Sequence, residues 1–141
     1  MVSTRSILYR CSKGDDFKVA VKVIVPAIAA GSTDEIPVFY AQEDVYVHEF
    51  GIIPEAQITG DATNYMTLTF KNKGTSGSGT TSLGSKAFTS GIYAAFDYIQ
   101  VSTGKLLSEG EVVSLAKSEA GTGMDMPRLC VVIIYSPRSK A

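Results

Sequence analysis

The sequence has little of several features that would point to a particular chemistry. Among 141 residues there are two cysteines, one histidine and no tryptophan. The 13 lysines and arginines nearly balance the 14 aspartates and glutamates, so the formal net charge is −1. A protein that binds nucleic-acid phosphates usually has a basic excess or a basic stripe, and the sequence has neither. We therefore expect no nucleic acid among its partners.

Long apolar runs are also missing. The run Leu129–Tyr135 is far too short to cross a membrane as a helix. Residues Met1–Arg10 lack the apolar segment of a signal peptide. The composition therefore predicts a soluble protein that is made in a cytoplasm and has no membrane partner.

The two cysteines, Cys11 and Cys130, stand far apart in the chain. Because Cys130 lies inside an apolar run, the simplest interpretation is two reduced thiols, with Cys130 in the core. A disulfide that joins the N-terminal segment to the last strand is the alternative, and the spacing does not decide between them.

The sequence does have an alternation of apolar and polar residues, which predicts β-strands. In the central segment Ile58–Thr81, the residues Met66, Leu68 and Phe70 alternate with polar ones between two turn signals. Phe17–Val25 alternates in the same way. Further strands are expected at Ile36–Tyr40, Val45–Ile53, Ala87–Val101, Glu111–Lys117 and Arg128–Tyr135.

Some residues within these strands carry positional information. Pro37 indicates an edge strand, Gly51 is a candidate bulge, and Pro54 is expected to end its strand. The segment Arg128–Tyr135 is apolar on both faces, which predicts a central strand covered on each side.

Loops are expected at Ala27–Glu35, Gly74–Ser85 and Glu119–Pro127, with turns at Thr103–Lys105 and Ser108–Gly110. About eight short strands and no long helix predict an all-β fold. We expect a single antiparallel β-sandwich, jelly-roll-like, over residues 17–141. Residues 1–16 are expected to form an N-terminal arm or an edge strand.

Candidate catalytic residues are few. His48 is the single histidine, and no G-x-S-x-G motif supplies a nucleophile for it. One histidine is too few for a cupin-like metal site. The stretch Gly74–Ser82 lacks the lysine of a phosphate-binding loop. We therefore expect no catalytic, cofactor-binding or metal-binding residues, and no enzyme. A small hydrolase with His48 as its base is the rival hypothesis.

Two stretches carry a resemblance to a known family. Ala30–Thr81 contains the pattern ITG-x-x-TN, then a strand, then N-x-G-x-x-G-x-G. Leu106–Pro127 contains a GE-V strand before a G-x-G loop, where GD-V is also common. In this order, these motifs resemble the capsid decoration proteins (cement or head-fibre proteins) of tailed bacteriophages. The resemblance covers about half of the chain.

The resemblance implies a function as well as a fold. It implies a small, often jelly-roll-like β-sandwich on the outer surface of the virion. Such proteins commonly form homotrimers around local threefold axes and bridge neighbouring major capsid proteins. The alternative is a carbohydrate- or receptor-binding module on the virion surface, which would use the same fold and aromatic loops.

The N-terminal segment Met1–Asp16 matches no part of this resemblance. It contains the apolar residues Ile7, Leu8 and Tyr9 beside basic residues. Laid on a neighbouring chain as an added strand, such a segment would satisfy its backbone groups. We therefore expect capsid or subunit contacts at Arg5, Ile7, Leu8, Tyr9 and Arg10.

Overall fold

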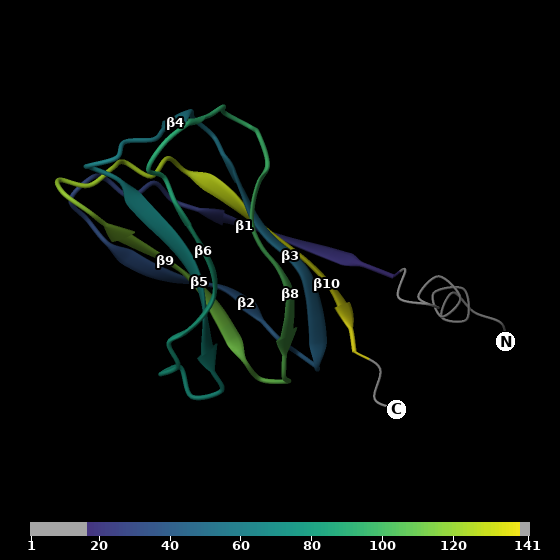
Figure 1. Ribbon diagram of the computed structural model, residues 1–141. Helices are drawn as coiled ribbons and strands as arrows, with labels where there is room; N and C mark the ends of the chain where they lie inside the picture. The colour runs from purple at the N-terminus through teal and green to yellow at the C-terminus, as the bar shows by residue number, and fades with distance from the viewer. Residues whose placement is uncertain (1–16, 139–141) are drawn as a thin grey trace, which may run out of the picture.

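The computed structural model describes residues 17–138, which Figure 1 shows as two curved sheets that face each other. This part of the chain contains ten strands and no helix. The strands are β1 (Val19–Val25), β2 (Asp34–Tyr40), β3 (Val45–Pro54), β4 (Ile58–Thr59), β5 (Met66–Gly74), β6 (Thr81–Ala87), β7 (Ile92–Tyr93), β8 (Ile99–Leu107), β9 (Val112–Glu119) and β10 (Leu129–Pro137).

The eight long strands form two antiparallel sheets, in the orders β1-β10-β3-β8 and β2-β9-β5-β6. The short strands β4 and β7 pair with each other. Numbered one to eight along the chain, the long strands have the orders 1-8-3-6 and 2-7-4-5, which define a jelly roll. The prediction of an all-β, jelly-roll-like sandwich is therefore confirmed.

The core lies between the two sheets. Successive side chains of a strand point to opposite faces, and the apolar ones point toward the other sheet. In β5, Met66, Leu68 and Phe70 are fully buried, and the residues between them are half-buried. Phe70 packs across the sandwich against Phe50 of β3, with 5.0 Å between the ring centroids. The alternation predicted for β1 is present too, and it ends at the fully buried Val25.

Three predictions about single residues are confirmed. Pro37 lies in β2, which is an edge strand. The pairing of β3 with β8 shifts register between Phe50 and Gly51, as expected for a bulge. Strand β3 ends at Pro54.

Strand β10 lies between β1 and β3, as predicted for a central strand. Its outward face, however, is only partly covered. Val132 is buried, whereas Cys130 and Ile134 are half-buried. The prediction that Cys130 lies in the core is wrong, because its side chain is on the outer face of the sheet, where it is a free thiol. Cys11 lies outside the described residues.

The predicted loop Gly74–Ser85 is too long. Strand β6 begins at Thr81 and pairs with β5, and Leu83 is buried in the core. This strand is hard to recognise in the sequence because most of its residues are small or polar. Leu83 is its one large apolar side chain in the core.

The predicted turn Thr103–Lys105 is also wrong, because Gly104 has a positive φ of 66° inside the continuous strand β8. The single strand expected at Ala87–Val101 is instead divided among the end of β6, the short β7 and the start of β8. The chain turns at Gly91, before β7, and at Phe96, between β7 and β8, where both residues have positive φ angles.

A buried lysine closes one end of the sandwich. The side chain of Lys117 in β9 is 1% exposed, and its ammonium donates to the carbonyls of Ala29 (3.0 Å) and Ser32 (2.9 Å). It also donates to the Glu119 carboxylate at 2.5 Å. The ammonium therefore ties the loop between β1 and β2 to the end of β9.

The Glu119 carboxylate continues this network. Its Oε2 accepts the backbone N–H groups of Gly31 and Met124, each at 3.1 Å. The hydrogen bond from Lys117 is the largest cause that lowers the pKa of the Glu119 carboxyl below its usual 4.5. Because folding lowers this pKa, the network stabilises the fold above the usual pKa and is lost as the pH falls through the lowered value.

We predict that Lys117→Met lowers the free energy of unfolding at neutral pH by about 2 kcal/mol, because the carbonyls of Ala29 and Ser32 and the Glu119 carboxylate lose their donor. The variant should also lose less stability than the parent on acidification, because Glu119 loses the hydrogen bond that lowers its pKa most, while the weaker bonds from Gly31 and Met124 remain. Urea unfolding across an acid-to-neutral pH series measures both effects. An unchanged acid dependence would contradict the assigned role of Glu119.

Candidate functional site

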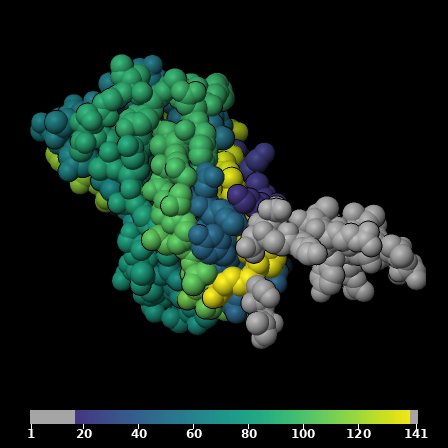
Figure 2. Space-filling model, turned by 45° about the vertical axis from the view of Figure 1, so that its right-hand side comes forward, coloured from purple at the N-terminus to yellow at the C-terminus, as the bar shows by residue number. Residues whose placement is uncertain are grey.

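Exposed apolar side chains gather on the loop between β6 and β8, residues 88–98, which we call the apical loop. Ile92 is 69% exposed, Phe96 74% and Tyr98 42%. Figure 1 shows this loop rising beside β4 above the two sheets, and Figure 2 shows it at one extremity of the molecule. An apolar group of this kind on an exposed loop is typical of a contact surface.

The apical loop is fastened at several points. Its Phe88 N–H donates to the Met66 carbonyl (3.0 Å), and its Phe96 N–H donates to the Pro54 carbonyl (2.8 Å). The rings of Phe88 and Tyr93 pack edge to face at 5.2 Å. The exposure of Ile92 and Phe96 is therefore part of an ordered arrangement.

Phe96 also has an unusual backbone conformation. Its φ is 67°, and it is the one non-glycine residue in the described chain with a positive φ. This conformation costs roughly 1–2 kcal/mol for a residue with a Cβ atom. Since the Phe96 ring is mostly exposed, its burial contributes little stability to the described chain that would offset this cost. Such strain is often found at functional sites.

Tyr98 joins the apical loop to the outer face of β3. Its hydroxyl donates to Glu49 Oε1 at 2.8 Å, and its ring lies so close to Gly51 that a Cβ atom there would collide with it. Burial, followed by Glu49, raises the pKa of Tyr98. The phenol therefore stays neutral and keeps its role as a donor.

The motifs of the Ala30–Thr81 stretch hold the apical loop in place. Gly60 N–H donates to the Gly91 carbonyl (2.8 Å), and Asp61 N–H donates to the Phe88 carbonyl (3.2 Å). A Cβ atom at Gly60 would collide with the backbone of Ser90. The ITG-x-x-TN motif is therefore a structural support for the exposed apolar side chains.

The two matched stretches also meet each other. The Asp61 carboxylate accepts the N–H groups of Thr63 and Asn64, and these two bonds lower its pKa. Asn64 Oδ1 in turn accepts the N–H of Thr122 at 2.8 Å, from the later G-x-G loop. Gly121 must be a glycine, because its φ is 61° and a Cβ atom would meet Asn64.

The other glycine-rich stretch forms a closed turn at the opposite end of β5. Asn72 Oδ1 accepts the N–H of Gly74 (2.8 Å), and the Lys73 carbonyl accepts the N–H of Gly79 (2.9 Å). The residues between them are exposed. No cationic side chain of the stretch Gly74–Ser82 is available for a phosphate, since it contains none.

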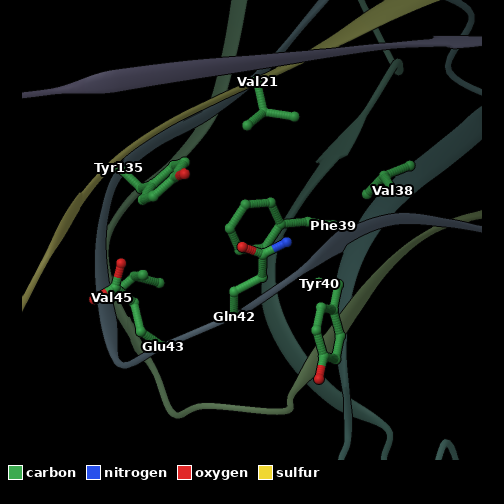
Figure 3. A pocket seen from close by; sticks show the side chains of 8 residues that line it. All are labelled: Val21, Val38, Phe39, Tyr40, Gln42, Glu43, Val45 and Tyr135. Atoms are coloured by element: carbon green, nitrogen blue, oxygen red, sulfur yellow. The ribbon is translucent and has the colours of Figure 1, made fainter.

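A second apolar region lies at the side of the sandwich between the edge strands β1 and β2, which we call the β1–β2 seam. It contains a hollow of about 260 Å³ (Figure 3). The hollow is lined by Val21, Val38, Phe39, Tyr40, Gln42, Glu43, Val45 and Tyr135. The rings of Phe39 and Tyr135 contact each other edge to face at 5.2 Å. Apolar side chains thus form most of the lining.

The opposite side of the sandwich is closed. There, Ser102 Oγ of β8 donates to the Leu83 carbonyl of β6 at 2.5 Å. Gly84 lies so close to Ser102 that a Cβ atom at Gly84 would collide with it. The two edges on this side are therefore in contact, which leaves the β1–β2 seam as the open side.

His48 forms a pair with a serine but has no acid partner among residues 17–138. Its Nε2 lies 2.9 Å from Ser136 Oγ, and its ring contacts that of Tyr46. Ser136 is buried. A hydrolytic triad needs a carboxylate on the other ring nitrogen and a substrate pocket at the serine, and His48 does not line the hollow of the seam.

Other expectations concern metals, membranes and the N-terminal segment. Residues 17–138 contain no cluster of three or more side chains suited to hold a metal ion. In the same range, no helix is long and apolar enough to cross a membrane. The expected contact residues Arg5, Ile7, Leu8, Tyr9 and Arg10 lie outside the described residues.

No protein-family model matches this chain, and no curated protein matches its sequence. Among solved structures, it is similar to a chain in the structure of infectious bursal disease virus, Gx strain, with 9% sequence identity and a TM-score of 0.37. The match covers 89% of this chain but 35% of the viral chain, so this chain spans about a third of its neighbour's length. At so low a similarity, we transfer no residue role.

We predict that Phe96→Gly raises the free energy of unfolding by up to about 1 kcal/mol, because glycine adopts a positive φ without strain. Phe96→Ala is the matched control, since it removes the same ring but keeps the Cβ atom. Thermal or urea unfolding compares the two variants. If Phe96→Gly is less stable than Phe96→Ala, the backbone at this position is not strained.

Proposed function

We propose that this chain is a structural protein of the virion, a decoration or cement protein on the outer surface of a tailed-phage head. In this proposal it stabilises contacts between neighbouring major capsid proteins. The observation that carries it is the link between the phage-like motif and the exposed apolar loop: Gly60 and Asp61 donate to the carbonyls of Gly91 and Phe88, in the loop that exposes Ile92 and Phe96. The jelly roll is compatible with this function, which is argued from the loop and not from the fold.

The mechanism is mechanical. A protein that binds across the boundary between capsid subunits adds its binding free energy to the assembled lattice and nothing to separated subunits. Large apolar side chains such as Ile92 and Phe96 contribute most when a partner buries them, at roughly 1.5–3 kcal/mol each. The strained, exposed Phe96 is therefore the side chain we assign to the centre of the capsid contact.

We also propose that three copies act together as a homotrimer. Once one copy is bound, the next contacts are effectively intramolecular, so weak individual contacts add up to firm attachment.

The two apolar regions, the apical loop and the β1–β2 seam, lie toward opposite ends of the sheet. Phe96 bonds Pro54, which pairs with Leu129, whereas the hollow is lined by Tyr135 at the other end of β10. This separation suits a protein with two different partners.

The alternative function, a carbohydrate- or receptor-binding module, draws on the hollow of the seam. Tyr40, Gln42 and Glu43 provide polar groups at its margin, as a sugar site requires. The remaining lining is formed by valines and the rings of Phe39 and Tyr135. This composition favours apolar side chains as the occupant, and we place the carbohydrate hypothesis second.

We predict that replacing Ile92 and Phe96 together with serine weakens binding to undecorated heads of the phage that encodes this protein by at least about tenfold, because both anchors are lost. Leu106→Ser is the matched control, since Leu106 is 58% exposed but lies in β8, outside the apical loop. Co-sedimentation of purified protein with heads measures the binding. Equal binding by the double variant and the control would refute the assigned contact surface.

We further propose that the chain has no catalytic activity, so that His48 has a structural role. His48→Ala should lower stability by about 1 kcal/mol, through loss of the bond to Ser136. Head binding should stay within about twofold of the parent. A folded His48→Ala protein that no longer binds heads would count against this assignment.

A further inference from the structure

Two cationic side chains beside the apical loop already have partners within the chain. Arg128 Nε lies 2.8 Å from Glu55 Oε2, directly after the Pro54 residue that accepts the N–H of Phe96. Lys86 Nζ lies 5.0 Å from the centroid of the Tyr93 ring, which is part of the loop. One carboxylate and one aromatic ring at this end of the sandwich are therefore each matched with a cation of the same chain.

Phe96 and Asp97 have no such match. The Phe96 ring is 74% exposed, and the Asp97 side chain is exposed next to it in the sequence. Among residues 17–138, no other ring and no cation stacks on Phe96. In the same range, no ion pair or side-chain hydrogen bond involves the Asp97 carboxylate. An aromatic ring and a carboxylate are thus both left for a partner.

The backbone holds this pair in place. Phe96 N–H donates to the Pro54 carbonyl at 2.8 Å, and Asp97 N–H donates to the Ala94 carbonyl at 3.3 Å. The Cα atoms of adjacent residues are about 3.8 Å apart, so one long side chain of a partner can contact both groups. Because the loop is ordered before binding, little conformational entropy is lost when such a contact forms.

We propose that an arginine of the capsid partner stacks on the Phe96 ring and pairs with the Asp97 carboxylate. This inference rests on the proposed function and names the chemistry of the partner at the same surface. The planar guanidinium of arginine stacks on aromatic faces and also presents two parallel N–H donors to a carboxylate. The ammonium of lysine is a compact point charge and lacks this geometry.

A protein partner fits the loop better than a lipid surface does. Segments that bind at membrane surfaces combine apolar side chains with lysines or arginines that face the anionic headgroups. Residues 88–98 contain no lysine or arginine, and their one charged residue is Asp97. Glu49, which accepts the hydroxyl of Tyr98, adds a second carboxylate beside the loop. Anionic headgroups would be repelled here, whereas a cationic side chain would be attracted.

The first test is a double-mutant cycle measured by co-sedimentation with undecorated heads of the phage that encodes this protein. Phe96→Leu keeps a large apolar side chain and the Cβ atom but removes the aromatic face, and should weaken binding about threefold. Asp97→Asn keeps the shape but removes the charge, and should weaken binding at least about fivefold.

Together, the two substitutions should weaken binding by clearly less than the product of the single effects, because both act on one guanidinium. Urea unfolding of the same four proteins shows whether the two substitutions interact in the unbound chain. If the effects on binding multiply, or if the non-additivity is equally large in unfolding, no shared cation exists and the proposal is wrong.

The matched control for charge is Glu109→Gln. Glu109 is exposed in the turn after β8, and β8 leads from the apical loop to the opposite end of the sandwich. This variant should bind heads within about twofold of the parent. Raising NaCl from about 50 to about 500 mM should weaken binding of the parent more than binding of Asp97→Asn, because salt screens the pair that the variant lacks. Equal salt dependence of the two proteins would contradict the proposal.

Two further arms identify the source of the cation and the class of partner. After selective acetylation of the lysines of the heads, the difference between the parent and Asp97→Asn should persist; its disappearance would assign the cation to a lysine and overturn the arginine. Co-sedimentation of the parent with phosphatidylcholine vesicles, abolished by replacing Ile92 and Phe96 with serine, would assign the loop to lipid instead. A parent protein that does not bind heads refutes the proposed function itself, whereas equal binding by the parent and Asp97→Asn refutes this inference alone.

Discussion

A sandwich of two four-stranded sheets has two sides where strand edges face each other, and each side must be closed or left to a partner. In this protein one side is closed by direct contact of β6 and β8, which Gly84 permits because a Cβ atom there would collide with Ser102. The other side remains open between β1 and β2. On this open side, three valines of β1 are only half-buried, and the contact between the rings of Phe39 and Tyr135 joins the two sheets.

The jelly-roll connections bring distant loops together at the apical end. Glu119, which is paired with Lys117, accepts a hydrogen bond from the loop around Gly31, and Asn64 accepts one from the loop around Thr122. These polar bonds join loops that are distant in the sequence, and the strained Phe96 is held separately by its bond to the Pro54 carbonyl. The polar network therefore has a structural role that its sequence positions do not reveal.

The sequence was sufficient for the strands that alternate, because burial of one face imposes a period of two. It was insufficient where a residue's role depends on tertiary neighbours. Gly104 lies within β8, although glycine between polar residues usually marks a turn. Lys117 looks like the polar end of a strand, but the loop between β1 and β2 accepts two hydrogen bonds from its ammonium, which is buried. Cys130 is in an apolar run, but the outer face of its strand has no covering sheet.

The exposed apolar anchors were equally hidden, for a physical reason. Apolar residues such as Ile92 and Phe96 are usual in strands, and their exposure comes from the tertiary structure, in which Phe96 has a positive φ and donates its N–H to the Pro54 carbonyl. Catalytic sites leave motifs because chemistry requires particular groups at fixed spacing, whereas a contact surface requires only area and rigidity. In such a protein, the recognisable motif belongs to the support and not to the contact. ITG-x-x-TN is detectable in the sequence because its contacts depend on residue type: a Cβ atom at Gly60 would collide with Ser90, and Asn64 Oδ1 accepts the N–H of Thr122.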